Sequence, residues 1–112
     1  VPAGIVGDEP EFLGESLADT AARDLLEETG YRAGKIEPLI VTPTSAGLTS
    51  EMIHFFHATE LTREHDGGGT EVEDIIVHHV HLTNLRDWLK EQEQQGRIID
   101  FKIHAALWLA GR

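Results

Sequence analysis

The sequence predicts an α/β (α+β) fold in which helices flank a mixed sheet. Segments with the helical spacing of apolar residues stand at both ends of the chain, and segments rich in β-branched and aromatic residues stand between them. In chain order we expect one helix, three strands and two further helices. The length of 112 residues, 40% of them hydrophobic, suits one small domain with a modest core, which we place at residues 1–112.

The first helix is expected between Ser16 and Gly30. Ser16 is a favoured N-cap residue, and Asp19 three positions later completes a capping-box pattern. Gly30 can end the helix in a left-handed conformation. Four apolar residues share one face of this helix and are expected to pack on a core: Ala18, Ala22, Leu25 and Leu26.

The opposite face of this helix is acidic. Asp24, Glu27 and Glu28 fall within an arc of roughly 100°, because each residue turns about 100° around the helix axis. They lie in the C-terminal half, where the helix macrodipole disfavours negative charge. A cation would offset this cost, and Mg²⁺ prefers such oxygen ligands. The alternative is an ordinary solvated acidic face, which is the commoner case for an arbitrary acidic helix.

The middle of the chain predicts three strands, at residues 35–42, 51–59 and 74–82. Pro38 is expected to interrupt the first strand once, because proline cannot donate to the strand ladder. A short loop joins the first two strands. The connection at residues 61–70 contains three consecutive glycines and is expected to be a flexible polar loop.

The end of the chain predicts two helices. One is expected at residues 85–95, with Thr83 or Asn84 as its N-cap, and the other at about 101–109, with Asp100 as its N-cap. The spacing of Trp88 and Trp108 among leucines predicts core packing rather than base stacking. His78, His79 and His81 precede these helices; a strand would point His78 away from the other two, which favours a structural or surface role over a metal site.

Charge and composition exclude several classes of function. The formal net charge of −11 argues against a nucleic-acid partner, and an anionic substrate would need bound metal to reverse the local field. The chain has no cysteine, so neither disulfides nor thiolate metal sites can form. No apolar run approaches the roughly 20 residues of a membrane span, and no signal peptide is visible. We therefore expect a cytoplasmic protein without a membrane partner.

The residues around the acidic helix resemble the Nudix box. That pattern reads Gly-x5-Glu-x7-Arg-Glu-U-x-Glu-Glu-x-Gly-U, where U is a bulky apolar residue. Two positions differ here: Asp24 replaces a glutamate, and Glu9 stands where the leading glycine is expected, although Gly7 could serve if the loop is two residues longer. The matching residues are Glu15, Arg23, Leu25, Glu27, Glu28, Gly30 and Tyr31.

Three further segments resemble the ADP-ribose pyrophosphatase branch of the Nudix hydrolase superfamily. They are Pro2-Ala3-Gly4, the loop at residues 42–47 with Glu51 behind it, and the acidic segment at residues 71–75 with the terminal helix behind it. The resemblance implies a Nudix-type mixed sheet whose N-terminal strands precede Val1. We therefore expect a chain completed by residues outside it, and a homodimer in the whole protein.

The resemblance also implies an activity and its site residues. The expected reaction is hydrolysis of the pyrophosphate bond of ADP-ribose or a related nucleoside-diphosphate sugar such as GDP-mannose. Glu71 would act as the catalytic base, and Arg23 would pair with the carboxylates. Gly4 and Glu51 would contact the substrate. The implied ligands of Mg²⁺, or of Mn²⁺ in its place, are the Ala3 carbonyl, Asp24, Glu27, Glu28 and Glu73.

A second function stays open from the sequence, namely a catalytically impaired Nudix-like module that binds a nucleotide or regulates a partner. Asp24 and the absence of the upstream strands favour this alternative, whereas the presence of both glutamates of the helix, Glu71 and Glu73 favours the enzyme. A plain solvated loop is the alternative for Glu71 and Glu73. An ordinary surface ion pair on a helix is the alternative for Arg23.

Overall fold

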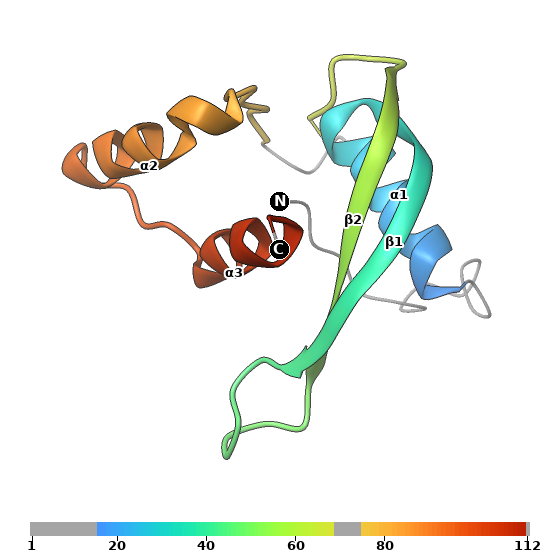
Figure 1. Ribbon diagram of the computed structural model, residues 1–112, viewed down its shortest axis with the longest axis horizontal. Coiled ribbons are helices and arrows are strands. Elements are labelled where there is room, and N and C mark those ends of the chain that lie inside the picture. The colour runs from blue at the N-terminus through green and yellow to red at the C-terminus, as the bar shows by residue number, and fades with distance from the viewer. Residues whose placement is uncertain (1–15, 69–74, 112) are drawn as a thin grey trace. The chain divides into compact units, whose positions relative to one another are not determined.

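The computed structural model describes residues 16–68 and 75–111. Its helices are α1 (Leu17–Thr29), α2 (Leu85–Gln94) and α3 (Phe101–Ala110), and its strands are β1 (Tyr31–Pro43) and β2 (Met52–Arg63), as labelled in Figure 1. The chain divides into two compact parts, one ending at Val77 and one beginning at His78. Helices and a sheet are both present, so the expected α/β (α+β) class is confirmed.

Helix α1 begins and ends where the sequence predicts. The Ser16 Oγ accepts a hydrogen bond from the Asp19 N–H at 3.1 Å. At the other end Gly30 has φ 82°, and its N–H donates to the Leu26 carbonyl at 2.9 Å. The helix packs against the two strands, chiefly against β1, with its apolar residues half-buried and Thr20 buried (Figure 1). Local capping chemistry therefore sets both helix ends.

Strands β1 and β2 form an antiparallel hairpin, in register from Tyr31 opposite Arg63 to Pro43 opposite Met52. The register shifts between Pro38 and Ile40, which confirms the predicted interruption at Pro38. Both strands extend further than predicted toward the open end of the hairpin. Beside this extension the Arg32 guanidinium makes a two-bond ion pair with the Glu64 carboxylate.

The prediction of a third strand at residues 74–82 is wrong for residues 75–82, which the structure describes. Residues 75–81 have no regular structure, and Leu82–Asn84 form a 3₁₀ turn. The alternation of apolar residues persists, with Ile76 exposed between two half-buried neighbours, but pattern alone does not make a strand without a partner to pair with. Within residues 16–68 and 75–111 the sheet is the two-stranded antiparallel hairpin, so a parallel pair, which a mixed sheet needs, is not seen there.

The part beginning at His78 carries α2 and α3, both within one residue of the predicted ends. Asn84 takes the N-cap position of α2 but makes no side-chain capping bond; instead the His81 Nδ1 accepts from the Thr83 N–H at 3.4 Å in the turn before it. Trp88 is half-buried, with its ring 5.1 Å from that of His78. None of the helices among the described residues has the length and hydrophobicity that a membrane-spanning helix requires.

The prediction that Trp108 packs in the core is wrong. Its side chain is 69% exposed, while the neighbouring Leu109 is buried. Successive residues on a helix point about 100° apart, so the burial of Leu109 turns Trp108 away from the same surface. The buried apolar residues of this part are Leu89 and Leu109.

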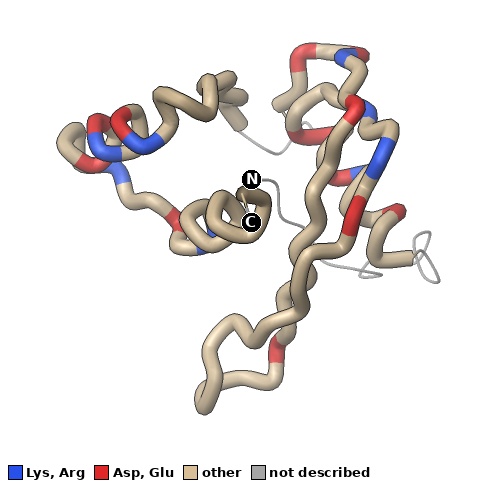
Figure 2. Tube along the Cα trace, viewed as in Figure 1, with Lys and Arg blue, Asp and Glu red and all other residues tan. Residues whose placement is uncertain are grey.

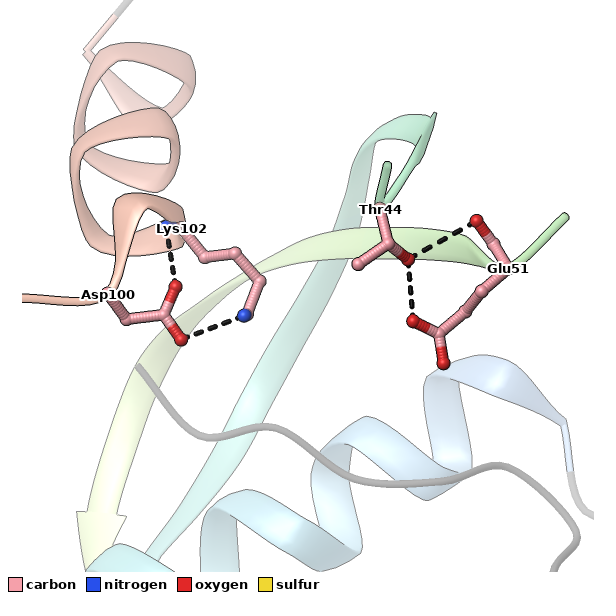
Figure 3. Close-up of polar contacts among 4 residues, drawn as sticks. All are labelled: Thr44, Glu51, Asp100 and Lys102. Carbon is pink, nitrogen blue, oxygen red and sulfur yellow. Dashed lines mark hydrogen bonds and ion pairs between the residues drawn. The ribbon is translucent and has the colours of Figure 1, made fainter. Parts of the chain in front are cut away.

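Asp100 begins α3 as predicted. Its Oδ1 accepts from the Lys102 N–H and its Oδ2 from the Lys102 Nζ, each at 2.8 Å (Figure 3). The hydrogen bond from the Lys102 side chain, followed by the backbone bond, holds the pKa of Asp100 below its ordinary value of 3.8. A carboxylate whose pKa is lowered by folding stabilises the native state above its ordinary pKa and loses that contribution as the pH falls through the lowered value.

We expect Asp100→Asn to lower the melting temperature at pH 7 and to lose this difference in acid. Asparagine can still cap the helix, but it carries no charge to pair with Lys102. The measurement is thermal unfolding of both proteins from pH 7 to pH 2. The matched control is Asp87→Asn in the first turn of α2. A gap between wild type and Asp100→Asn that persists unchanged to pH 2 would contradict the assignment.

Candidate functional site

The acidic face of α1 has the ion pairing that the sequence predicts for Arg23. The Arg23 Nη1 lies 3.6 Å from the Asp24 Oδ1 and 3.7 Å from the Glu27 Oε1. Both distances exceed hydrogen-bond length, so these contacts are ion pairs. Asp24 is 16% exposed and Glu27 is 40% exposed. The guanidinium therefore offsets part of the repulsion between two carboxylates on one helix face.

The last turn of α1 is joined to residues 64–68, which follow β2; we call this contact the α1 junction. The Gly68 N–H donates to the Glu28 carbonyl at 2.8 Å, and the Glu64 N–H donates to the Gly30 carbonyl at 2.7 Å. The Glu64 side chain is held in turn by Arg32, whose hydrogen bond lowers the pKa of that carboxyl. The junction thus fixes the backbone beside Glu28.

Gly67 and Gly68, which the sequence places in a flexible polar loop, make hydrogen bonds through their backbone N–H groups in the structure. The Gly67 N–H donates to the His65 Nδ1 at 3.0 Å, and the Gly68 N–H donates to α1. Both glycines have positive φ, 81° and 108°. Sequence reasoning missed this contact because it joins segments that are distant along the chain. The one local clue was a pair of glycines directly after a polar turn.

The chemistry of the donor set on α1 fits a hard divalent cation, since Asp24, Glu27 and Glu28 offer carboxylate oxygens. Among the residues that the structure describes, no three acidic or histidine side chains gather as a group that could hold a metal ion. The predicted ligand set also draws on Ala3 and Glu73, which lie outside the described residues. Predicted metal binding therefore depends on more than the face of α1.

Glu51 lies at the other end of the hairpin from the α1 junction (Figure 1). Its Oε1 accepts from the Thr44 Oγ1 at 2.6 Å, and the same hydroxyl lies 3.2 Å from the Glu51 carbonyl oxygen (Figure 3). That carbonyl also accepts from the Thr44 N–H at 3.1 Å. A strand advances about 3.3 Å per residue, so the two ends of this hairpin are roughly 35–40 Å apart. The structure thus does not bring Glu51 together with Glu28. Thr44, which orients Glu51, was missed by sequence reasoning, although its place in a polar loop was visible.

Comparison with known proteins gives relatives but no family match. No family model matches the chain. The GDP-mannose pyrophosphatase of Citrobacter koseri is 36% identical over 81% of this chain and 46% of its own length. That of Pectobacterium atrosepticum is 35% identical over 98% of this chain and 64% of its own length. A Bacillus methanolicus protein named methanol dehydrogenase activator is 37% identical over 96% of this chain and 54% of its own length.

These similarities support a Nudix-like relationship. The chain spans between 46% and 64% of the length of these three relatives. The Nudix-like motif falls on α1, whose described residues carry Arg23 and the three acids. The roles of all the predicted site residues stay predictions, and four of these residues lie outside the described ones: Ala3, Gly4, Glu71 and Glu73.

Proposed function

We propose that the protein hydrolyses the pyrophosphate bond of a nucleoside-diphosphate sugar in a Mg²⁺-dependent reaction. The products are a nucleoside monophosphate and a sugar phosphate, and the candidate substrates are GDP-mannose and ADP-ribose. The observation that carries the proposal is the acidic face of α1, with Arg23 against Asp24 and Glu27 at the Nudix-like motif. The relatives named GDP-mannose pyrophosphatase support the same class of substrate.

In this mechanism the acidic residues of α1 bind the metal ion, and Glu71, which comes after β2 in the chain, accepts a proton. The Asp24, Glu27 and Glu28 carboxylates, the Ala3 carbonyl and Glu73 would hold Mg²⁺. When bound, Mg²⁺ neutralises the phosphate oxygens and lowers the pKa of a water. Arg23 offsets part of the electrostatic repulsion between the Asp24 and Glu27 carboxylates.

Glu71 is the proposed general base. The water oxygen forms a bond to one phosphorus while the bond from that phosphorus to the bridging oxygen breaks, and Glu71 accepts the proton of the water. Gly68 follows β2 and lies three residues before Glu71 in the sequence. Its N–H donates a hydrogen bond to the backbone carbonyl of Glu28. This connection supports a base that acts beside the acids of α1.

A substrate screen on the intact protein tests the proposal. We expect hydrolysis of at least one nucleoside-diphosphate sugar with millimolar Mg²⁺ and none with EDTA, measured as sugar phosphate released. We also expect Mg²⁺ to raise the melting temperature, because a ligand that binds only the native state stabilises it by about 2.7 kcal/mol at a hundred times its Kd. Equal melting curves with Mg²⁺ and EDTA, together with no turnover, would contradict the proposal.

The proposal includes a homodimer as the working assembly. Figure 2 shows few charges along the distal part of the hairpin, and Glu51 is the one Lys, Arg, Asp or Glu between residues 38 and 59. Val41 and Met52 are exposed there, and a neutral surface with exposed apolar side chains is typical of an interface. Light scattering of the intact protein should give twice the chain mass, and a monomer at micromolar concentration would refute the assembly.

A regulatory module is the second candidate function. The relative from Bacillus methanolicus is named an activator of methanol dehydrogenase, and Asp24 departs from the usual glutamate of the motif. In this case the protein would bind a nucleotide without releasing products. Calorimetric binding of a nucleoside-diphosphate sugar with no hydrolysis at any divalent metal concentration would favour the module over the enzyme.

A further inference from the structure

The last turn of α1 is held from outside the helix. The Gly68 N–H bonds to the Glu28 carbonyl at 2.8 Å, and the Gly30 carbonyl accepts from the N–H groups of Glu64 at 2.7 Å and His65 at 3.3 Å. The last four carbonyl groups of any helix have no partner within the helix. Residues 64–68 therefore supply donors at the place where α1 itself has none.

This turn needs such support more than an ordinary helix end does. It carries Glu27 and Glu28, and it has no basic residue. Negative charge is disfavoured at a helix C-terminus, and helix ends fray. The N–H groups of the junction place positive dipole ends against this terminus. They thus oppose both causes of fraying at the two residues that carry adjacent carboxylates.

We propose that residues 64–68 are a positioning element for Glu27 and Glu28, in which Gly67 makes the closest approach to the helix. The element keeps the last turn helical, so that both carboxylates stay on the face of α1 that also carries Asp24. An effect of this element on Mg²⁺ affinity rests on the proposed function, whereas its anchoring of the last helical turn does not. Gly67 acts through Glu28 and is a positioning residue rather than a catalytic one.

Close packing explains why a glycine stands at this position. Gly67 has φ 81°, and a Cβ there would lie 2.6 Å from the Glu28 carbonyl oxygen and 2.7 Å from the Thr29 carbonyl carbon. Neither atom is the end of a flexible side chain, so any larger residue forces the two backbones apart. The His65 Nδ1 closes the turn by accepting from the Gly67 N–H at 3.0 Å.

Gly67→Ala tests the proposal against the matched control Gly47→Ala. Gly47 has a similar positive φ of 88°, but nothing lies within 4 Å of its Cβ position, so its variant carries the cost of positive φ without overlap. The first measurement is amide hydrogen exchange of residues 26–30 in EDTA, relative to the first turn of α1. We expect faster exchange in this last turn for Gly67→Ala than for Gly47→Ala.

The second measurement is Mg²⁺ affinity of the intact protein by calorimetry. Partners that orient metal ligands typically contribute 10–100-fold in affinity, so we expect a loss of about tenfold or more in Gly67→Ala and none in Gly47→Ala. If the wild type binds no Mg²⁺, the proposed function fails, and the exchange measurement still decides the positioning element. Equal exchange of the last turn in both variants overturns the proposal.

A milder pair of variants tests the same turn if Gly67→Ala does not fold. His65→Ala removes the acceptor for the Gly67 N–H without any steric overlap, whereas an asparagine at this position can accept from the N–H two residues on. We expect faster exchange of the last turn of α1 in His65→Ala and recovery in His65→Asn. Wild-type exchange in His65→Ala would overturn the role of this turn.

Discussion

Glu71→Gln is expected to lower kcat by about 10²–10⁴ while leaving Mg²⁺ affinity nearly unchanged, since this is the usual contribution of a positioned general base. Glutamine keeps the size of the side chain but cannot accept the proton of the attacking water. The measurements are steady-state hydrolysis of the substrate identified by the screen and calorimetric titration with Mg²⁺. Glu93→Gln on the exposed surface of α2 is the control, and it should match the wild type.

Glu28→Gln is expected to fail in a different way. It removes a charge from the proposed metal ligands, so Mg²⁺ affinity and turnover should fall together. Asp24→Glu restores the usual residue of the motif and should keep or raise activity. Full activity in Glu71→Gln would move the role of base to Glu73 or Glu27. An identical pattern in Glu28→Gln and Glu71→Gln would contradict their separate assignments.

Gly30→Ala should produce the largest loss of stability among single glycine substitutions at the α1 junction. Gly30 has φ 82°, where a Cβ costs about 1–2 kcal/mol. That Cβ would also lie 1.9 Å from the His65 carbonyl oxygen and 2.9 Å from the Gly67 N. Overpacking typically costs 1–3 kcal/mol, so we expect the free energy of unfolding to fall by about 2–5 kcal/mol.

Chemical denaturation of Gly30→Ala and Gly47→Ala isolates the packing contribution. Gly47→Ala carries a similar φ cost without the overlap, and it should lose about 1 kcal/mol. The difference between the two variants is therefore the cost of separating α1 from residues 64–68. Equal destabilisation of both variants would mean that the close approach at Gly30 carries little energy.

The parts of the fold that were predicted correctly are those specified by neighbouring residues. Ser16 and Gly30 bound α1 through hydrogen bonds within three or four positions, and Asp100 begins α3 in the same way. Pro38 interrupts the hairpin because it lacks a donor, wherever the partner strand comes from. The Arg23 ion pairs follow equally from spacing on one helix.

The errors arise where contacts between distant segments decide the structure. Residues 75–81 have strand-like alternation, but a strand also needs a partner strand to pair with, and local sequence does not reveal one. The extension of β1 to Tyr31 pairs this residue with Arg63, and the ion pair of Arg32 with Glu64 lies beside it. The hydrogen bond of Gly68 likewise needs the carbonyl of Glu28, which is distant along the chain. Of the candidate site, the sequence alone located the three acids on the first helix, and their role as metal ligands stays a prediction. Their junction with residues 64–68 required the structure.

At the end of the β1–β2 hairpin opposite its connecting loop, Arg32 forms an ion pair with Glu64, and the Gly30 carbonyl accepts backbone hydrogen bonds. The connecting loop has open space around Gly47. The two strands therefore do not depend on that loop to stay together, and lengthening a loop adds only about 0.6 kcal/mol per doubling. A peptide tag or a fluorescent probe inserted after Gly47 would leave the register of the strands intact, and it would report on the protein from the end of the hairpin remote from the acidic face of α1.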